Sequence, residues 1–177
     1  MLVESLSQVP YFSACDDAAL AEVAAVTQLR TVRAGEQIVT EGETCRGLYV
    51  VIEGRAKVVK VSAEGREQVL LILGPGRTFN DVPVFDGGTN PGNVEALEDG
   101  TVALVPGAAM RRLMERHPII AAAALRVLAS RLRTMTLMVE SLAFRDVTAR
   151  VAGLIRACAS GEQPVVEGVP HACAHIT

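Results

Sequence analysis

The chain has 177 residues, which is the usual size of one domain or of one domain with an appendage. Half of the residues are hydrophobic, but no uninterrupted apolar run of about 18 residues occurs. The first residues also lack a basic segment followed by an apolar one. These features argue against a membrane protein and a secreted protein, so we expect a cytoplasmic chain with no membrane partner.

The charge is small overall but uneven along the chain. The net charge is −3, from 17 basic and 20 acidic residues, which argues against an autonomous nucleic-acid binder. Residues 1–110 carry 8 basic and 15 acidic side chains, whereas residues 111–156 carry 9 basic and 3 acidic side chains. The four cysteines form no CxxC pair, so we expect free thiols.

The first predicted elements are a short helix and a series of strands. Residues 16–27 begin with two acidic side chains and continue with helical apolar spacing. From Gln28 to Val105, short β-rich runs are separated by glycines at intervals of about 8 to 12 residues, which is typical of an all-β domain. The runs are LRTV, QIVT, GLYVVI, AKVVKV, QVLLIL and TVALV. We predict an antiparallel barrel or sandwich, and no enzyme of the Rossmann or P-loop type, because neither glycine fingerprint occurs.

Helical patterns follow the strands. Residues 107–117 predict a short helix, and the absence of Gly and Pro from Ile119 to Ala152 predicts a long one. In the long helix, apolar residues recur at alternating steps of four and three, at Ala121, Leu125, Leu128, Leu132, Met135, Val139 and Leu142. Such a seam can pack on its own domain. Because a helix of about 25 residues extends about 38 Å, beyond a small barrel, we favour a homodimer through this seam.

The order of helix, β-domain and long seam helix resembles the sensor half of the cyclic-AMP receptor and fumarate/nitrate-reduction regulator (CRP/FNR) family of bacterial transcription factors. The resemblance covers essentially the whole chain, and its strongest piece is LAFRDVTARV at residues 142–151. Supporting pieces are Pro10-Tyr11-Phe12, GLYVVIEG at residues 47–54 and FNDVPVF at residues 79–85.

The resemblance implies a mainly β fold with α-helices, a cyclic-nucleotide-binding β-roll (a double-stranded β-helix or jelly roll). Residues 1–117 would form the effector-sensing roll with flanking short helices, and residues 118–144 the dimerisation helix. Residues 145–177 would form the hinge and the start of a winged helix-turn-helix domain that we expect beyond Thr177. Through that domain the regulator would bind DNA and RNA polymerase, and we expect no enzymatic activity.

The family's phosphate-binding cassette is altered here. Its Gly-Glu pair falls on Asn80-Asp81, and its Arg-Ser or Arg-Ala pair falls on about Pro91-Gly92. No Arg or Lys occurs between Arg77 and Arg111, so the cassette lacks the guanidinium that would neutralise a phosphodiester. Cyclic AMP is therefore disfavoured as the effector. The segment from Asn90 to Asn93 also fits an ordinary turn, because all its residues are turn formers.

The predicted effector site combines the cassette with the long helix. Its residues are Asn80, Asp81, Val82, Asn90, Gly92, Asn93, Arg131, Met135 and Thr136. We expect Asp81 to pair with Arg131, which would leave no cation for an anionic ligand and would favour a small apolar effector or haem. We expect no metal site. Two alternatives stay open, namely a cyclic-nucleotide module of a kinase or channel and a structural dimer without ligand.

Overall fold

The computed structural model describes residues 2–144, 152, 155 and 156, without the side chains of residues 138 and 141–144. In this part of the chain the elements are α1 (Leu2–Ser7), α2 (Asp17–Val26), β1 (Gln28–Val32), β2 (Gln37–Val39), β3 (Gly47–Glu53), β4 (Ala56–Val61), β5 (Glu67–Leu73), β6 (Thr78–Phe79), α3 (Asp81–Asp86), β7 (Asn93–Ala96), β8 (Gly100–Pro106), α4 (Gly107–Arg116) and α5 (Pro118–Phe144). All six predicted β-runs form strands, and the three predicted helices are present.

The predicted first helix is confirmed as α2, and its start has a clear local cause. The side chain of Asp16 accepts a hydrogen bond from the backbone N–H of Ala19 at 2.8 Å, which caps the helix. A further helix, α1, precedes it and was not predicted, because its six residues are too few to show a helical period.

The strands form two antiparallel four-stranded sheets, with the orders β1-β8-β3-β6 and β2-β7-β4-β5. The predicted β-roll class is therefore confirmed. In the first sheet the register aligns Gln28 with Leu104, Leu104 with Tyr49, and Tyr49 with Phe79. Because alternate residues of a strand share a face, this row of side chains projects from one face of the sheet.

Valine is the most frequent residue in the core between the two sheets. The central side chains Val51, Val94 and Val102 are each at most 2% exposed. The rings of Tyr49 and Phe79 stack at 4.9 Å at the edge of this core. Burying a side chain of this size contributes roughly 1.5–3 kcal/mol, so these valines stabilise the packing of the two sheets.

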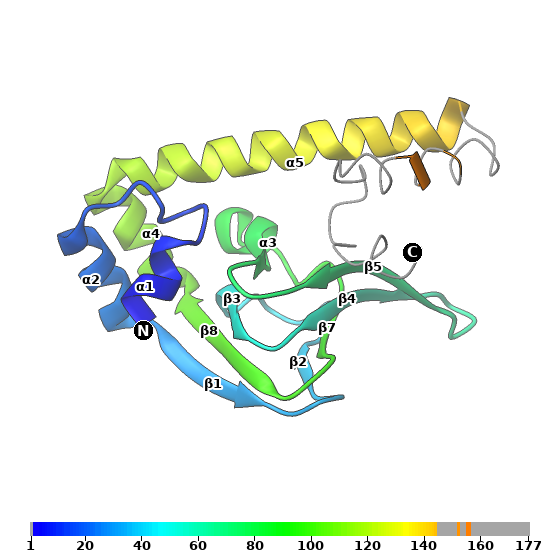
Figure 1. Cartoon of the computed structure of the whole chain (residues 1–177), viewed down its shortest axis with the longest axis horizontal. Helices are drawn as coiled ribbons and strands as arrows, with labels where there is room; N and C mark the ends of the chain where they lie inside the picture. The colour runs from blue at the N-terminus through cyan, green and yellow to red at the C-terminus, as the bar shows by residue number, and fades with distance from the viewer. Residues whose placement is uncertain (1, 145–151, 153–154, 157–177) are drawn as a thin grey trace. The chain divides into compact units, whose positions relative to one another are not determined.

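The other face of the first sheet is covered by helices. Leu48, Val50 and Val105 are fully buried there, so β3 is apolar on both faces. Helices α3 and α4 contact β3, and α2 contacts both α4 and β8. Figure 1 shows α1, α2 and α4 gathered at one end of β1 and β8.

A long helix, α5, is present where the sequence predicts one; it begins at Pro118 and is described as far as Phe144. The chain divides into two compact units, residues 1–125 and 126–177, and the division falls within α5. Most of the described seam is exposed in a single chain, including Leu125, Leu132, Met135 and Val139, whereas Leu128 is half-buried. The side chain of Leu142 and nearly all of the predicted hinge lie outside the described residues. Among the described helices, none is long and apolar enough to cross a membrane.

Candidate effector-binding site

The cassette begins at a residue with an unusual backbone conformation. Asn80 lies between β6 and α3 with φ 62° and ψ 26°, and it is the one described non-glycine residue with a positive φ. Asn tolerates this left-handed conformation better than most residues, and Gly tolerates it best. An asparagine can therefore occupy the position that the family pattern gives to glycine.

The side chain of Asn80 bonds to the other end of the cassette. Its amide nitrogen, Nδ2, donates a hydrogen bond to Oδ1 of Asn90 at 2.8 Å, and we call these two residues the amide pair. Both side chains are buried. Asn90 in turn donates through Nδ2 to the carbonyl of Thr40 at 2.9 Å. The amide pair is thus hydrogen-bonded within itself and to the chain at the end of β2.

The loop between β2 and β3 holds the second half of the cassette in place. The backbone N–H of Asn90 donates to the carbonyl of Glu43, and the N–H of Gly42 donates to the carbonyl of Asn90, both at 2.9 Å. Asn93 is turned toward the same loop, where its Oδ1 accepts from the N–H of Glu41 at 2.9 Å. Asn90 and Asn93 therefore hold the loop between β2 and β3 against the cassette.

Asp81 faces away from solvent and toward the N-terminal segment. Its Oδ2 accepts hydrogen bonds from the hydroxyl of Tyr11 at 2.5 Å and from the hydroxyl of Thr78 at 2.7 Å. Asp81 is only 2% exposed, and a buried carboxylate needs such donors. This carboxylate therefore links the start of α3 to a segment seventy residues earlier in the chain.

A nearby thiol completes the surroundings of the amide pair. Sγ of Cys45 lies 3.9 Å from Nδ2 of Asn80 and donates toward the carbonyl of Gly47 at 3.6 Å. Burial raises the pKa of the Cys45 thiol, so the neutral form is favoured. The Cys45 thiol and the Thr40 carbonyl are thus two neutral groups next to the amide pair.

The remaining predicted site residues are distributed between the roll and α5. Gly92 is buried, and a Cβ atom there would lie 3.1 Å from the carbonyl oxygen of Val59, so the backbone strands approach closely. Val82 is 53% exposed on α3. Arg131, Met135 and Thr136 belong to the second compact unit. Their approach to the cassette, including a pair between Asp81 and Arg131, stays a prediction.

Sequence reasoning did not find the partners of the cassette. Tyr11 was noted only as part of a resembling motif, and neither Thr40 nor Thr78 was identified. No local pattern links these residues to Asn80 and Asp81, because the contacts depend on the fold. A buried tyrosine hydroxyl needs a partner, and this is the one signal that could have prompted a search for a nearby acceptor.

The fold and this cassette define the class of protein. The family model described as "Cyclic nucleotide-binding domain" matches residues 29–117, and the chain belongs to that family. It is homologous to CRP-like transcription regulators. The resemblance inferred from the sequence is therefore confirmed.

Three similar proteins illustrate this relationship. The "CRP-like cAMP-activated global transcriptional regulator" of Mycobacterium tuberculosis is 30% identical over 149 residues, which are 84% of this chain and 66% of the relative. The crystal structure of Thermus thermophilus catabolite activator protein is 27% identical with a TM-score of 0.71, covering 86% of this chain and 72% of that one. The N-terminal domain of a transcriptional regulator from Streptomyces coelicolor is 31% identical with a TM-score of 0.65. The match covers 81% of this chain and 99% of that one.

Proposed function

We propose that this chain is the effector-sensing and dimerisation region of a CRP/FNR-type DNA-binding transcription regulator whose cassette does not bind cyclic AMP. The observation that supports this proposal is the amide pair. Nucleotide binders of the family hold the phosphate with an arginine, whose position falls on about Pro91 here, and the neighbouring Asn90 instead bonds to Asn80 at 2.8 Å. The role is regulatory rather than catalytic.

The energetics of phosphate binding support this assignment. A phosphodiester that enters the cassette would lose its hydration and would meet no guanidinium from residues 78–110, which contain neither Arg nor Lys. The lost compensation is a few kcal/mol, on the scale of one desolvated ion pair. The ligand would also have to break the hydrogen bond of the amide pair or leave it buried beneath the phosphate. Both effects weaken binding of an anion.

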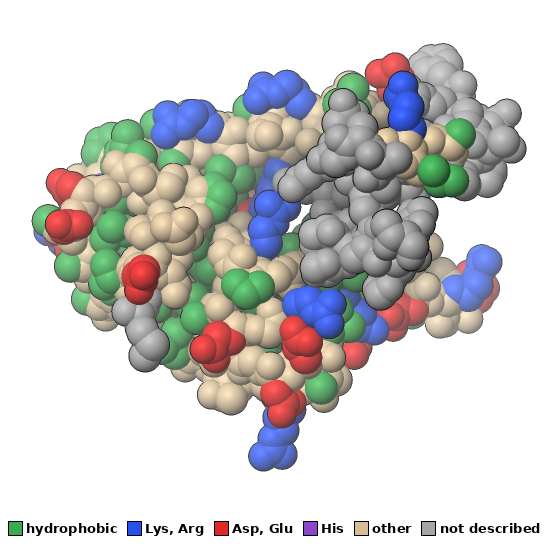
Figure 2. Space-filling view, viewed as in Figure 1, with side chains coloured by type: hydrophobic (Ala, Val, Ile, Leu, Met, Phe, Trp, Pro, Cys, Tyr) green, Lys and Arg blue, Asp and Glu red, His purple; other side chains and the backbone are tan. Residues whose placement is uncertain are grey.

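The charge of the surrounding roll also disfavours an anionic effector. Residues 1–110 carry 8 basic and 15 acidic side chains, and on the face shown in Figure 2 acidic side chains are spread over the roll. A negative surface lowers the local concentration of nucleotides. We therefore propose a neutral or largely apolar effector in the cassette, with haem among the candidates, and Met135 and Thr136 of α5 as its further contacts.

The exposed seam supports a homodimer. Leu132 is 66% exposed in a single chain, and Leu125 and Val139 are similarly open to solvent. An apolar stripe of this kind is covered when two copies pair along it. In the whole protein, which we place in the cytoplasm, a winged helix-turn-helix domain would then bind DNA as a dimer and contact RNA polymerase.

Analysis of the co-purified ligand tests this function. The purified chain is examined by visible absorption for haem, and its small molecules are extracted and identified by mass spectrometry. We expect haem or a neutral, largely apolar compound, at an amount that falls in the Asn90→Ala variant. Recovery of cyclic AMP at one molecule per chain would overturn the proposal, and a chain with no ligand that binds none on addition would favour the structural-dimer alternative.

A further inference from the structure

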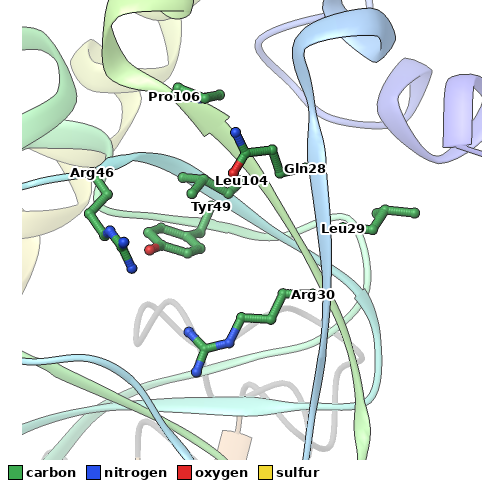
Figure 3. Close-up of a pocket in the computed structure, with 7 residues that line it drawn as sticks. All are labelled: Gln28, Leu29, Arg30, Arg46, Tyr49, Leu104 and Pro106. Carbon is green, nitrogen blue, oxygen red and sulfur yellow. The ribbon is translucent and has the colours of Figure 1, made fainter.

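The β-roll carries a pocket that shares no residue with the cassette. It is a pocket of about 320 Å³ lined by Gln28, Leu29, Arg30, Arg46, Tyr49, Leu104 and Pro106. This volume is at the lower end of the range of about 300–1,000 Å³ that is usual for small-molecule sites. The lining comes from β1, β3 and β8 and from the residue before β3, and it includes two arginines (Figure 3).

The register of the first sheet explains why these side chains meet. Gln28, Leu104 and Tyr49 occupy one row across β1, β8 and β3. Arg30 is two residues after Gln28 on β1, so its side chain leaves the same face of the sheet. The pocket is thus formed where the inner face of this sheet changes from the valine core to polar residues.

The position of Arg46 is fixed through its backbone. The N–H of Gly107 donates to the carbonyl of Arg46 at 3.0 Å. The next residue, Gly47, lies so close to β8 that a Cβ atom would be 2.1 Å from the carbonyl oxygen of Val105. Only glycine fits there, so the chain enters β3 along a defined path and Arg46 projects at the rim of the pocket.

The two arginines differ in their electrostatic state. The guanidinium of Arg30 forms an ion pair with Glu36 at 2.5 Å, whereas Arg46 forms no ion pair with any described residue. Both positive charges act on the phenol of Tyr49, where they oppose the rise in its pKa that burial causes. In Figure 3 the two guanidinium groups and the Tyr49 hydroxyl turn toward the same side of the pocket.

We propose that this pocket binds a small organic anion with one carboxylate and an apolar body. The carboxylate would be held by Arg46, with Arg30 as the second cation and the Tyr49 hydroxyl as a neutral donor. The planar guanidinium matches the two oxygens of a carboxylate. Leu104, Pro106 and the ring of Tyr49 provide the apolar wall. This inference does not depend on the ligand of the cassette.

Calorimetric titration with cyclohexanecarboxylate tests the proposal, with acetate as the comparison that lacks an apolar body. At low ionic strength we expect the first anion to bind at least several-fold more tightly than acetate. Arg46→Gln should weaken binding at least about tenfold, the usual effect of losing a charged hydrogen-bond partner. Glu36→Gln, which removes the counter-charge of Arg30, should tighten binding about threefold. Arg66→Gln is the matched control, because it removes the same charge from a side chain 83% exposed outside the pocket.

A spectroscopic measurement separates specific binding from a general charge effect. The chain has two tyrosines and no tryptophan, so ¹³C-tyrosine NMR gives two ring signals, and Tyr49→Phe identifies one of them. The bound anion should raise the pKa of Tyr49, because it offsets the charges of Arg46 and Arg30. The proposal is overturned if cyclohexanecarboxylate does not bind, if Arg66→Gln weakens binding as much as Arg46→Gln, or if the Tyr49 signal does not respond.

Discussion

The hydroxyl of Tyr11 donates a hydrogen bond to Oδ2 of Asp81 at 2.5 Å, which connects the segment between α1 and α2 to the start of α3. Both residues are buried. The bond fixes the acidic residue of the cassette from the side of the N-terminal helices. The helices around the roll therefore stabilise the cassette as well as covering the first sheet.

The substitution Tyr11→Phe should destabilise the chain by about 1–3 kcal/mol, because it removes one donor from a buried carboxylate. Urea unfolding measures the loss. The control is Tyr49→Phe, since the Tyr49 hydroxyl makes no hydrogen bond with a described residue, and its loss should be clearly smaller. Equal losses in the two variants would show that the hydrogen bond from Tyr11 to Asp81 does not contribute measurably to the free energy of unfolding.

Two substitutions at Asn80 separate its backbone role from its side-chain role. Both Asn80→Gly and Asn80→Ala remove the hydrogen bond to Asn90, so both should be less stable than the wild type. Asn80→Ala should be about 1 kcal/mol less stable than Asn80→Gly, because alanine adopts the left-handed conformation at φ 62° poorly. Denaturant unfolding of the pair decides this, and an alanine variant as stable as the glycine variant would contradict the assigned strain.

The sequence patterns predicted the long elements and the short strand β2, but missed β6, β7, α1 and α3. The strands β3, β4 and β8 and the helices α2, α4 and α5 each carry enough apolar residues to show their period. β6 has two residues, and β7 has four, paired between β2 and β4. Such segments have too few residues to show a period, so a single sequence carries little local sign of them.

The resemblance to a family located the cassette. The hydrogen bonds inside the cassette were not predicted. Asn80 and Asn90 were both identified as site residues, yet their mutual hydrogen bond requires the backbone to turn back between α3 and β7. The pocket that contains Arg30 and Arg46 was not predicted at all. Arg30 and Arg46 lie on different segments, and only the sheet register brings them together.

The seam of α5 predicts a specific effect of charge. Leu132→Glu should convert a dimer into a monomer, because two carboxylates would face each other at the centre of the apolar seam. Sedimentation velocity gives the oligomeric state. Ser130→Glu adds the same charge to an exposed residue outside the seam and should leave the dimer intact. A dimer that persists in Leu132→Glu would contradict dimerisation through this helix.

Glu36 gives a prediction about pH. The backbone N–H of Arg33 and the guanidinium of Arg30 both donate to this carboxylate and hold its pKa below the usual value. A lowered pKa in the folded state means that the stabilisation is present above the unfolded pKa and is lost as the pH falls through the folded pKa. The stability difference between wild type and Glu36→Gln should therefore shrink between about pH 6 and about pH 3. Urea unfolding at both values measures it, and a difference that grows in acid would refute this.

The most direct test of the central claim is a calorimetric titration of the wild-type chain with cyclic AMP. The mycobacterial relative named above as cAMP-activated serves as the positive control. We predict no binding tighter than about millimolar, because residues 78–110 offer no arginine to hold the phosphate and the buried amide pair bonds to itself. A dissociation constant of about 1 μM or lower, equivalent to about −8 kcal/mol, would mean that backbone donors suffice and would contradict the account.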